Sequence, residues 1–372
     1  MTDDDGTDSD ASTVGTAPKQ ASQVNPPLAG TLRDETSELW LDQFARYLGF
    51  GRLSAFFNIS LPPSYLYAIV TVVGWTLTSA GADILVFDNT PIYVRNPYFL
   101  LQPFVLLVGV FGAHALDRSY RQVIDEMQLR ERSSNPGQFV DLIPRWLPWA
   151  LFATAAGLQL VRTYADFANF TTVGVVANGL VFPFVYAPII VQFLVVYVTI
   201  EFSLPWRLYK SDVSVHFLDP HGVGGLRPIG ELIKKAYYYV VGGLIAYALI
   251  TYAPGVSGWE ISTTAGAIFT GVWLSTIATV AFAVLLLHRF LHREKRKELY
   301  KLEAELHTHI ENPWEVRNYT VPDDATETVE DIRQRIQEVS STREYPATFS
   351  IWTQLLLSVA VPKALQLFLA GV

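Results

Sequence analysis

Six long apolar stretches dominate this sequence. A hydrocarbon core about 30 Å thick is crossed by a helix of about 20 apolar residues, and each stretch reaches that length. Hydrophobic residues make up 50% of the chain and are concentrated in runs too long for a soluble core. We therefore predict an all-α, polytopic membrane protein. Its six transmembrane helices are expected at roughly 65–87, 98–116, 145–163, 178–201, 232–252 and 264–287.

Basic residues lie almost entirely on one side of these stretches. The short connections at 88–97, 164–177 and 254–262 contain a single Lys or Arg, Arg95, with Arg162 at one edge. Loops rich in Lys and Arg stay in the cytoplasm. The pattern predicts a multi-pass protein of the cell membrane with its N-terminus in the cytoplasm.

Two segments precede the six-helix domain, which is expected to cover residues 61–288. Residues 1–33 are acidic and poor in large apolar side chains, which predicts a disordered tail. Residues 34–60 carry aromatic and aliphatic side chains at helical spacing, which predicts an interfacial amphipathic helix on the inner membrane surface. A helix packed against the cytoplasmic part of the protein fits the same pattern.

Residues 289–345 are predicted to form a cytoplasmic helical hairpin. Two apolar seams of matching length are separated by a link that contains prolines. Each seam is too short for an isolated coiled coil, so we expect the hairpin to pack on the helix at 117–130 or on another subunit. The seams are Leu299, Leu302, Leu306 and Ile310, and Val329, Ile332, Ile336 and Val339.

The C-terminal segment, residues 346–372, is predominantly apolar but contains Lys363 next to Pro362. Proline interrupts a helix, and a lysine inside hydrocarbon is costly. We therefore expect a membrane-associated segment of two half-length pieces that enter and leave on the cytoplasmic side. A seventh span, which would leave the C-terminus outside, is the alternative.

Charged residues are absent from the centres of the six stretches. Buried Asp, Glu, Lys and Arg mark ion and proton paths, so their absence disfavours a proton-coupled transporter. A pore lined by polar uncharged residues stays open, because Gln192, Ser275, Thr276 and Thr279 fall near mid-depth. The sixth stretch also repeats small residues every four positions, which predicts close helix packing. These are Ala267, Gly271, Ser275 and Thr279.

A glycine-rich loop at 213–230 is the candidate binding site. Glycines in such a loop let several backbone N–H groups converge on one anion, and basic residues follow directly. A lipid headgroup or another phosphate-bearing ligand would fit, and a purely structural turn before the fifth span is the alternative. The residues concerned are Gly222, Gly224, Gly225, Arg227, Lys234 and Lys235.

The same loop offers a second chemistry, because His216, Asp219 and His221 carry ligand atoms suited to a divalent metal. His288 and His292, one helical turn apart, are a further candidate pair, although their basic surroundings favour anchoring at the membrane surface. The chain has no cysteine, which excludes disulfides and thiolate sites. No cofactor is expected, and the net charge of −8 argues against a nucleic-acid partner.

The sequence Leu218-Asp-Pro-His-Gly-Val-Gly-Gly-Leu-Arg-Pro-Ile-Gly230 resembles a loop of uncharacterised prokaryotic multi-pass membrane proteins. That family has His-Pro-Asp before Gly-Gly-Leu, whereas this chain has Asp-Pro-His, so the leading histidine is missing. The excess of arginine over lysine and the acidic N-terminus are similar to haloarchaeal proteins. The resemblance implies that this loop is where a feature of the family would lie, and it implies no activity.

Two functions follow as hypotheses. The first is an oligomeric, channel-like or transport-related protein, a homo-oligomer in the lipid bilayer with the hairpin as its gating or assembly module. The second is a membrane sensor or scaffold that binds a phosphate-bearing ligand or headgroup at 216–235. We do not expect an enzyme, because the sequence contains no nucleophile–base pair or paired carboxylates.

Overall fold

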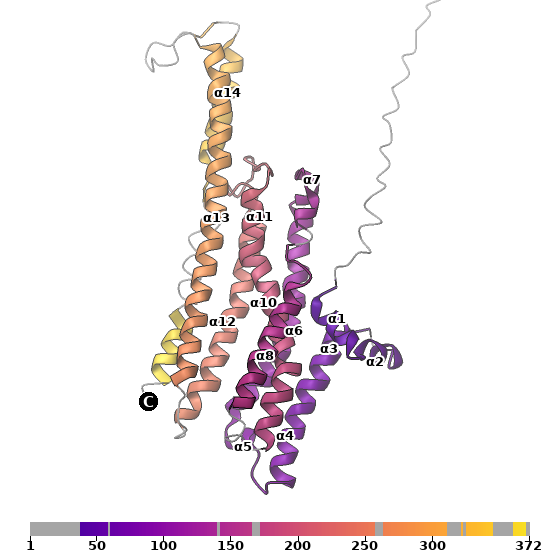
Figure 1. The fold of residues 1–372 in the computed structure, drawn as a ribbon. Helices are drawn as coiled ribbons and strands as arrows, with labels where there is room; N and C mark the ends of the chain where they lie inside the picture. Colours follow the sequence, from indigo (N-terminus) through magenta and orange to yellow (C-terminus); the bar gives the residue numbers. More distant parts are fainter. Residues whose placement is uncertain are drawn as a thin grey trace, which may run out of the picture. The chain divides into compact units, whose positions relative to one another are not determined.

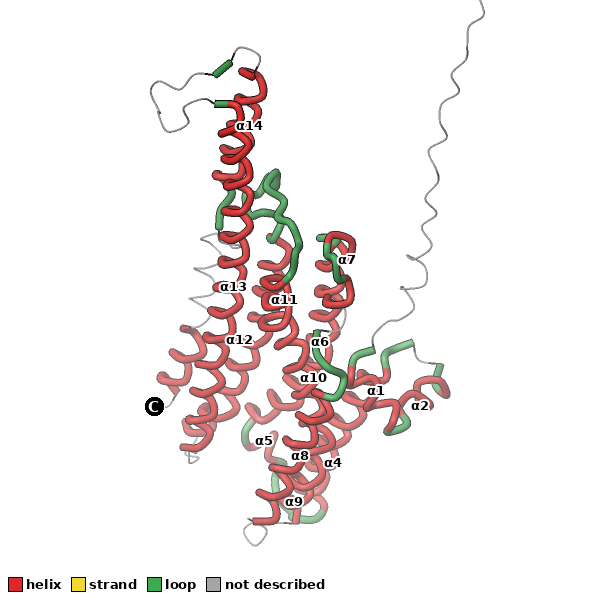
Figure 2. Tube along the Cα trace, turned by 45° about the horizontal axis from the view of Figure 1, so that its top comes forward, coloured by secondary structure: helices red, strands yellow, loops and turns green. Residues whose placement is uncertain are grey.

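The computed structural model describes residues 38–58, 60–139, 142–165, 172–256, 263–310, 321–322, 325–344 and 360–369. The chain divides into two units, Met1–Glu38 and Leu39–Val372. Only Glu38 of the first unit is described, so the predicted acidic tail lies outside the described residues. In the described part of the second unit, all regular structure is helical and no strand occurs (Figures 1 and 2).

The helices are numbered along the chain as in Figure 1. The first half contains α1 (Trp40–Tyr47), α2 (Phe50–Phe56), α3 (Pro63–Ala68), η1 (Ile69–Val73), α4 (Gly74–Leu85), α5 (Ile92–Arg95), η2 (Pro97–Leu100), α6 (Leu101–Glu126), α7 (Leu129–Arg132), η3 (Pro136–Phe139) and α8 (Leu147–Ala165). The second half contains α9 (Thr172–Val176), η5 (Ala177–Tyr186), α10 (Ala187–Val198), η6 (Thr199–Ser203), α11 (Leu204–Lys210), α12 (Arg227–Val256), α13 (Thr263–His309) and α14 (Thr326–Ser341). A last helix covers Ala360–Leu369.

Five continuous helical segments of the described chain are long and apolar enough to cross a membrane. The third predicted stretch forms α8, which is helical over 19 residues but is not one of the five. Gln159 and Arg162 make it less apolar than its neighbours. The five segments are Pro63–Leu85, Pro97–Glu126, Gly174–Lys210, Arg227–Ala253 and Gly266–His309.

Large apolar side chains point outward from several of these helices. Leu77 of α4 is 67% exposed, and Leu158 and Val161 of α8 are each 68% exposed. In water, contiguous apolar surface of this kind is unfavourable, whereas lipid tails cover it without cost. The fold is therefore compatible with a multi-pass membrane protein.

The helix from Gly174 to Lys210 widens into π-helical turns at η5 and η6. Prolines explain the widening, because each lacks the N–H that would bond to the carbonyl four residues earlier. Pro188 leaves the carbonyl of Phe184 free, and this oxygen accepts a hydrogen bond from the Tyr67 hydroxyl. Pro205 stands in the same relation to Glu201.

The predicted interfacial helix at 34–60 forms two short helices, α1 and α2. Trp40 and Phe44 of α1 pack against Trp149 and Phe152 of α8. The N–H of Leu41 donates a hydrogen bond to Gln192 Oε1 at 2.9 Å. Burial of Gln192 against α1 explains this polar residue in an apolar stretch, so it does not line a pore within this chain.

α13 continues far beyond its apolar part, and α14 packs along this charged extension (Figure 1). The contact is made by Leu302 of α13 with Ile332 and Val339 of α14, which belong to the two apolar seams of the sequence. Phe217 of the glycine-rich loop packs against the same cluster. The hairpin therefore meets that loop.

Candidate functional site

The glycine loop, residues 213–226 between α11 and α12, depends on three glycines for its shape. Gly222, Gly224 and Gly225 have φ values of +65°, +66° and +77°. This left-handed region is open to glycine and strained for other residues. A Cβ on Gly224 would also lie 2.5 Å from Val215 Cγ1 and 3.0 Å from Leu291 Cδ2. Backbone conformation and close packing therefore both fix the loop.

The carboxylate of Asp219 occupies the centre of the loop. Its Oδ1 accepts a hydrogen bond from the N–H of His221 (3.0 Å), and its Oδ2 accepts from those of Val223 (3.2 Å) and Gly225 (2.9 Å). Burial alone would raise the pKa of this carboxyl, but the three hydrogen bonds outweigh it and hold the pKa below its usual value. The converging N–H groups thus form an anion nest, and the anion that they bind is the protein's own side chain.

A cleft of about 940 Å³ opens beside the glycine loop. Its walls come from the end of α6, from α7, from the loop and from the first turns of α12. Cationic, imidazole and acidic side chains line it together with apolar ones, so a ligand would meet charges of both signs. The cationic, imidazole and acidic residues are Arg132, Arg227, Lys235, His216, His221, Glu126, Asp219 and Glu231.

The predicted anion-site residues divide into two groups. Gly225, Arg227 and Lys235 line the cleft, whereas Gly222, Gly224 and Lys234 are not among its lining residues. The ammonium group of Lys234 instead pairs with Glu231 at 2.7 Å. Two of the predicted glycines therefore shape the loop, and the basic side chains that can reach a ligand come from Arg227 and Lys235.

Neither of these cations pairs with a carboxylate among the contacts of the described residues. Arg227 Nη1 lies 2.7 Å from His221 Nε2, and Lys235 Nζ donates to Ser119 Oγ at 2.7 Å. An anion in the cleft can therefore bind to both side chains.

The predicted metal ligands do not converge. His216, Asp219 and His221 all line the cleft, but the described residues contain no group of three His, Asp or Glu side chains placed to hold a metal ion. Asp219 is engaged with backbone N–H groups as described above. His288 and His292 stack at 6.0 Å between ring centroids, and each lies against Glu344.

Glu344 joins the end of α14 to α13. Its Oε2 lies 2.9 Å from His292 Nδ1, and its backbone oxygen lies 3.1 Å from His288 Nδ1. Burial opposes ionisation of this carboxyl, but His292, Lys295 and His288 together hold its pKa below the usual value. This contact fixes the hairpin where α13 leaves its apolar part.

A backbone hydrogen bond links the hairpin directly to the glycine loop. The N–H of Arg343 donates to the oxygen of Gly222 at 2.8 Å. Lys295 of α13 donates to the oxygens of Ser340 and Thr342 at 2.8 Å each. A movement of the loop would therefore be transmitted to both α13 and α14.

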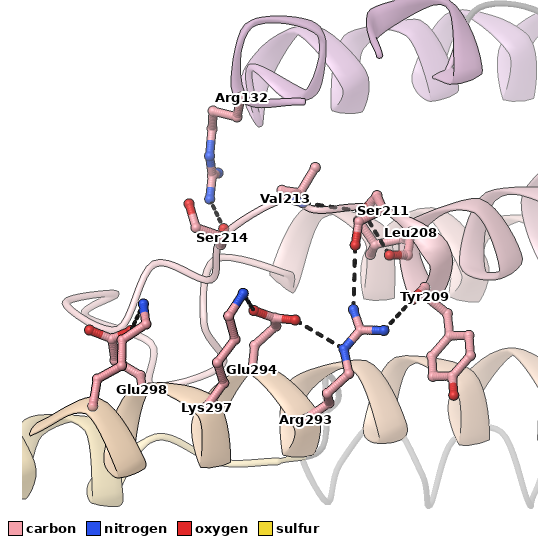
Figure 3. A network of polar contacts seen from close by, with 11 residues as sticks. Arg132, Leu208, Tyr209, Ser211, Val213, Ser214, Arg293, Glu294, Lys297 and Glu298 are labelled. Carbon is pink, nitrogen blue, oxygen red and sulfur yellow. Dashed lines mark hydrogen bonds and ion pairs between the residues drawn. The ribbon is translucent and has the colours of Figure 1, made fainter. Parts of the chain in front are cut away.

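Figure 3 shows how the segment leading into the loop is held from two sides. Arg132 of α7 donates to the backbone oxygen of Ser214. From the opposite side, Arg293 of α13 donates to the oxygens of Tyr209 (2.8 Å) and Ser211 (3.4 Å). These two arginines replace the hydrogen bonds that an irregular backbone lacks.

A buried polar cluster that the sequence analysis does not single out ties α1 to α3 and α6. The hydroxyl of Ser64 donates to Asp42 Oδ1 at 2.6 Å and lies 2.8 Å from His114 Nε2. Ser64 is 0% exposed, so the hydroxyl at the centre of the cluster is inaccessible to a substrate. The cluster holds three helices together. Its residues are far apart in the sequence, so their contact could not be predicted from it.

Comparison with protein families, with curated proteins and with solved structures found no match. The function must therefore be inferred from the chemistry of the chain itself.

Proposed function

We propose that this chain is a multi-pass membrane protein whose cleft beside the glycine loop binds a phosphate-bearing ligand. The main support for this proposal is the cleft of about 940 Å³, which is lined by Arg132, Arg227 and Lys235. Its volume falls within the range of small-molecule sites. In the proposed topology the six apolar stretches and the C-terminal segment cross the cell membrane, and the N-terminus, the cleft and the hairpin lie in the cytoplasm.

The mixed charge of the cleft narrows the ligand class. Arginine and lysine bind phosphate oxygens strongly. Glu126 and Glu231 on the same walls disfavour a bare anion and favour a ligand that also carries hydrogen-bond donors. A nucleotide or a sugar-bearing lipid headgroup has both kinds of group.

The hairpin is the proposed reporter of ligand binding. Gly225 of the glycine loop and Arg227, which begins α12 directly after the loop, line the cleft, while Gly222 of the loop accepts the hydrogen bond from Arg343 after α14. A ligand that shifts Arg227 therefore acts on a loop that is bonded to the hairpin. The chain would in this way sense its ligand and pass the change to a partner subunit or protein.

Neutralising the cleft cations is expected to reduce ligand-induced stabilisation. The thermal midpoint of the purified chain in nanodiscs should rise with ATP or with nanodiscs containing a phosphoinositide, and should rise less with inorganic phosphate, which is a bare anion. Arg227→Gln and Lys235→Gln should each weaken binding about tenfold, or about 1.4 kcal/mol.

Lys234→Gln is the matched control, because Lys234 lies next in sequence but outside the cleft lining. It should bind like the native chain. The response to soluble or membrane-bound probes identifies the ligand source, and no shift with any of the three would overturn the proposal.

We also propose that the C-terminal segment crosses the membrane as a seventh span. Glu344 lies beside His288 of α13, whereas Lys363 Nζ donates to Thr270 Oγ1 at 3.2 Å. Eighteen residues of helix separate positions 270 and 288, which corresponds to about 27 Å at 1.5 Å per residue. Described residues on the two sides of 345–359 thus contact opposite ends of one apolar helix, which favours crossing over the re-entrant arrangement.

Single cysteines are expected to report this topology without background, because the chain contains none. Gly371→Cys should react with a membrane-impermeant maleimide on intact cells. Glu330→Cys in α14 should react only after permeabilisation. Labelling of both variants only after permeabilisation would favour the re-entrant arrangement.

An oligomeric, channel-like protein is the second candidate. Ala267, Gly271 and Ser275 of the small-residue stripe of α13 are exposed in the single chain, and a Cβ on Gly271 would have no neighbour within 4 Å. Small outward-facing residues allow helices of two subunits to approach closely. Ion flux through liposomes containing the purified chain, in the absence of any ligand, would favour this candidate over the sensor.

A further inference from the structure

Glu201 is a fully buried acidic side chain in the helix from Gly174 to Lys210. It is 0% exposed, and neither Oε1 nor Oε2 has a hydrogen-bond partner. Glu201 is the last residue of the fourth apolar stretch. It is therefore outside the centre of that stretch, where the sequence contains no charged residue. Neither the cleft nor the glycine loop uses this carboxyl.

The surroundings of Glu201 are apolar and contributed by several helices. It lies in η6, a π-helical turn that packs against α12 and α13. Its neighbours in sequence, Ile200 and Leu204, are both 0% exposed and belong to the main apolar cluster. Phe202 stacks on Phe282 of α13 with ring centroids 4.8 Å apart. Single π-helical turns recur at functional sites, where they redirect a side chain.

An ionised carboxylate would be strongly unfavourable in this place. Burying a charge without a partner costs several kcal/mol or more, and such groups become neutral by taking up a proton. A cation bound at Glu201 would need several further ligands, and the described residues contain no group of three His, Asp or Glu side chains placed to hold a metal ion. The remaining partner is a proton.

We propose that Glu201 is an intramembrane proton-binding site. The carboxylic acid is the resting form, and its proton is released to water when the helices around η6 separate. The proposal extends beyond ligand binding in the cleft and does not depend on it. It gives the chain a group through which proton binding and helix packing are linked.

Phenols and hydroxyls, rather than cations, face this region. Tyr197 lies one turn before Glu201, close enough for the carboxylate charge to act on its phenol. Its hydroxyl is 2.9 Å from Thr279 Oγ1 of α13, and Tyr237 of α12 lies beside it. Side-chain hydroxyls can relay a proton, whereas none of them can neutralise a carboxylate.

Infrared spectroscopy of the purified full-length chain in nanodiscs tests this assignment. The native protein should show the carbonyl stretching band of a protonated carboxylic acid at neutral pH, and Glu201→Gln should lose it. Glu344→Gln is the matched control, because Glu344 is ionised and paired, and this variant should keep the band. An identical band in the native protein and in Glu201→Gln would overturn the proposal.

Chemical labelling of the native chain keeps the test independent of variant folding. A hydrophobic carbodiimide reacts with protonated carboxyl groups in apolar surroundings, and peptide mass spectrometry locates the adduct. Glu201 should be modified and Glu344 should not. Labelling of Glu344 with none at Glu201, or protection of Glu201 by sodium ions alone, would contradict a proton site.

Discussion

Gly224→Ala is expected to destabilise the folded chain by about 3 kcal/mol. The alanine would have to adopt a φ of +66°, which costs about 1–2 kcal/mol. Its Cβ would also stand 2.5 Å from Val215 Cγ1 and 3.0 Å from Leu291 Cδ2, and overpacking of this kind costs about 1–3 kcal/mol. The measurement is the free energy of unfolding from a denaturant titration in detergent micelles.

Two other glycines separate the causes. Gly222→Ala has the same backbone requirement, with a φ of +65°, but its Cβ would meet nothing within 4 Å, so a loss of about 1–2 kcal/mol is expected. Gly242→Ala lies in α12 and also meets nothing within 4 Å, so helix propensity should make it neutral or stabilising by up to about 1 kcal/mol. Equal losses at positions 222 and 224 would contradict the packing explanation.

The sequence predicts the parts of the fold that depend on the spacing of apolar residues within one segment. Long apolar runs specify spanning helices, and the seams containing Leu302 and Ile332 specify which faces of α13 and α14 meet. α8 shows the limit of this approach, because Gln159 and Arg162 dilute an apolar run that still folds as a helix. The packing of α1 depends on Gln192, which is 151 positions away from its partner Leu41. No local pattern contains such a contact.

Asp219 and Glu201 show the same limit within the candidate sites. Each is a single acid next to apolar sequence, yet Asp219 is surrounded by backbone N–H groups and Glu201 by none. The hydrogen bond that Asp219 accepts from the N–H two residues later is a local pattern that the sequence can predict. The bond to Gly225, six residues on, requires the folded loop. For Glu201, the only local signal is its place four residues before Pro205, at the end of an apolar run.

Asp219→Asn is expected to destabilise the folded chain by about 2 kcal/mol at neutral pH. Hydrogen bonds to a charged group each contribute about 1.5–3 kcal/mol, and partial exposure of this carboxylate reduces that value. Asparagine keeps one acceptor oxygen. Its amide NH₂ would face backbone N–H groups that now donate hydrogen bonds to Asp219, and two donors cannot bond to each other. Opening of the loop should also break the bond from Arg343 to Gly222, so the hairpin should become more sensitive to protease.

The pH dependence of this loss identifies its electrostatic origin. Because the folded-state pKa of Asp219 lies below its usual value, ionisation contributes stability that is complete above the usual value and is lost as pH falls through the folded-state value. The gap between the native chain and Asp219→Asn should therefore be constant near neutral pH and close in acid. Asp212→Asn is the control: hydrogen bonds from Ser134 also hold the pKa of Asp212 below its usual value, but this carboxylate is exposed and the bonds of 3.4–3.5 Å are long, so the gap should be smaller than at Asp219. A gap at Asp219 that persists unchanged into acid would mean that shape, and not charge, holds the loop.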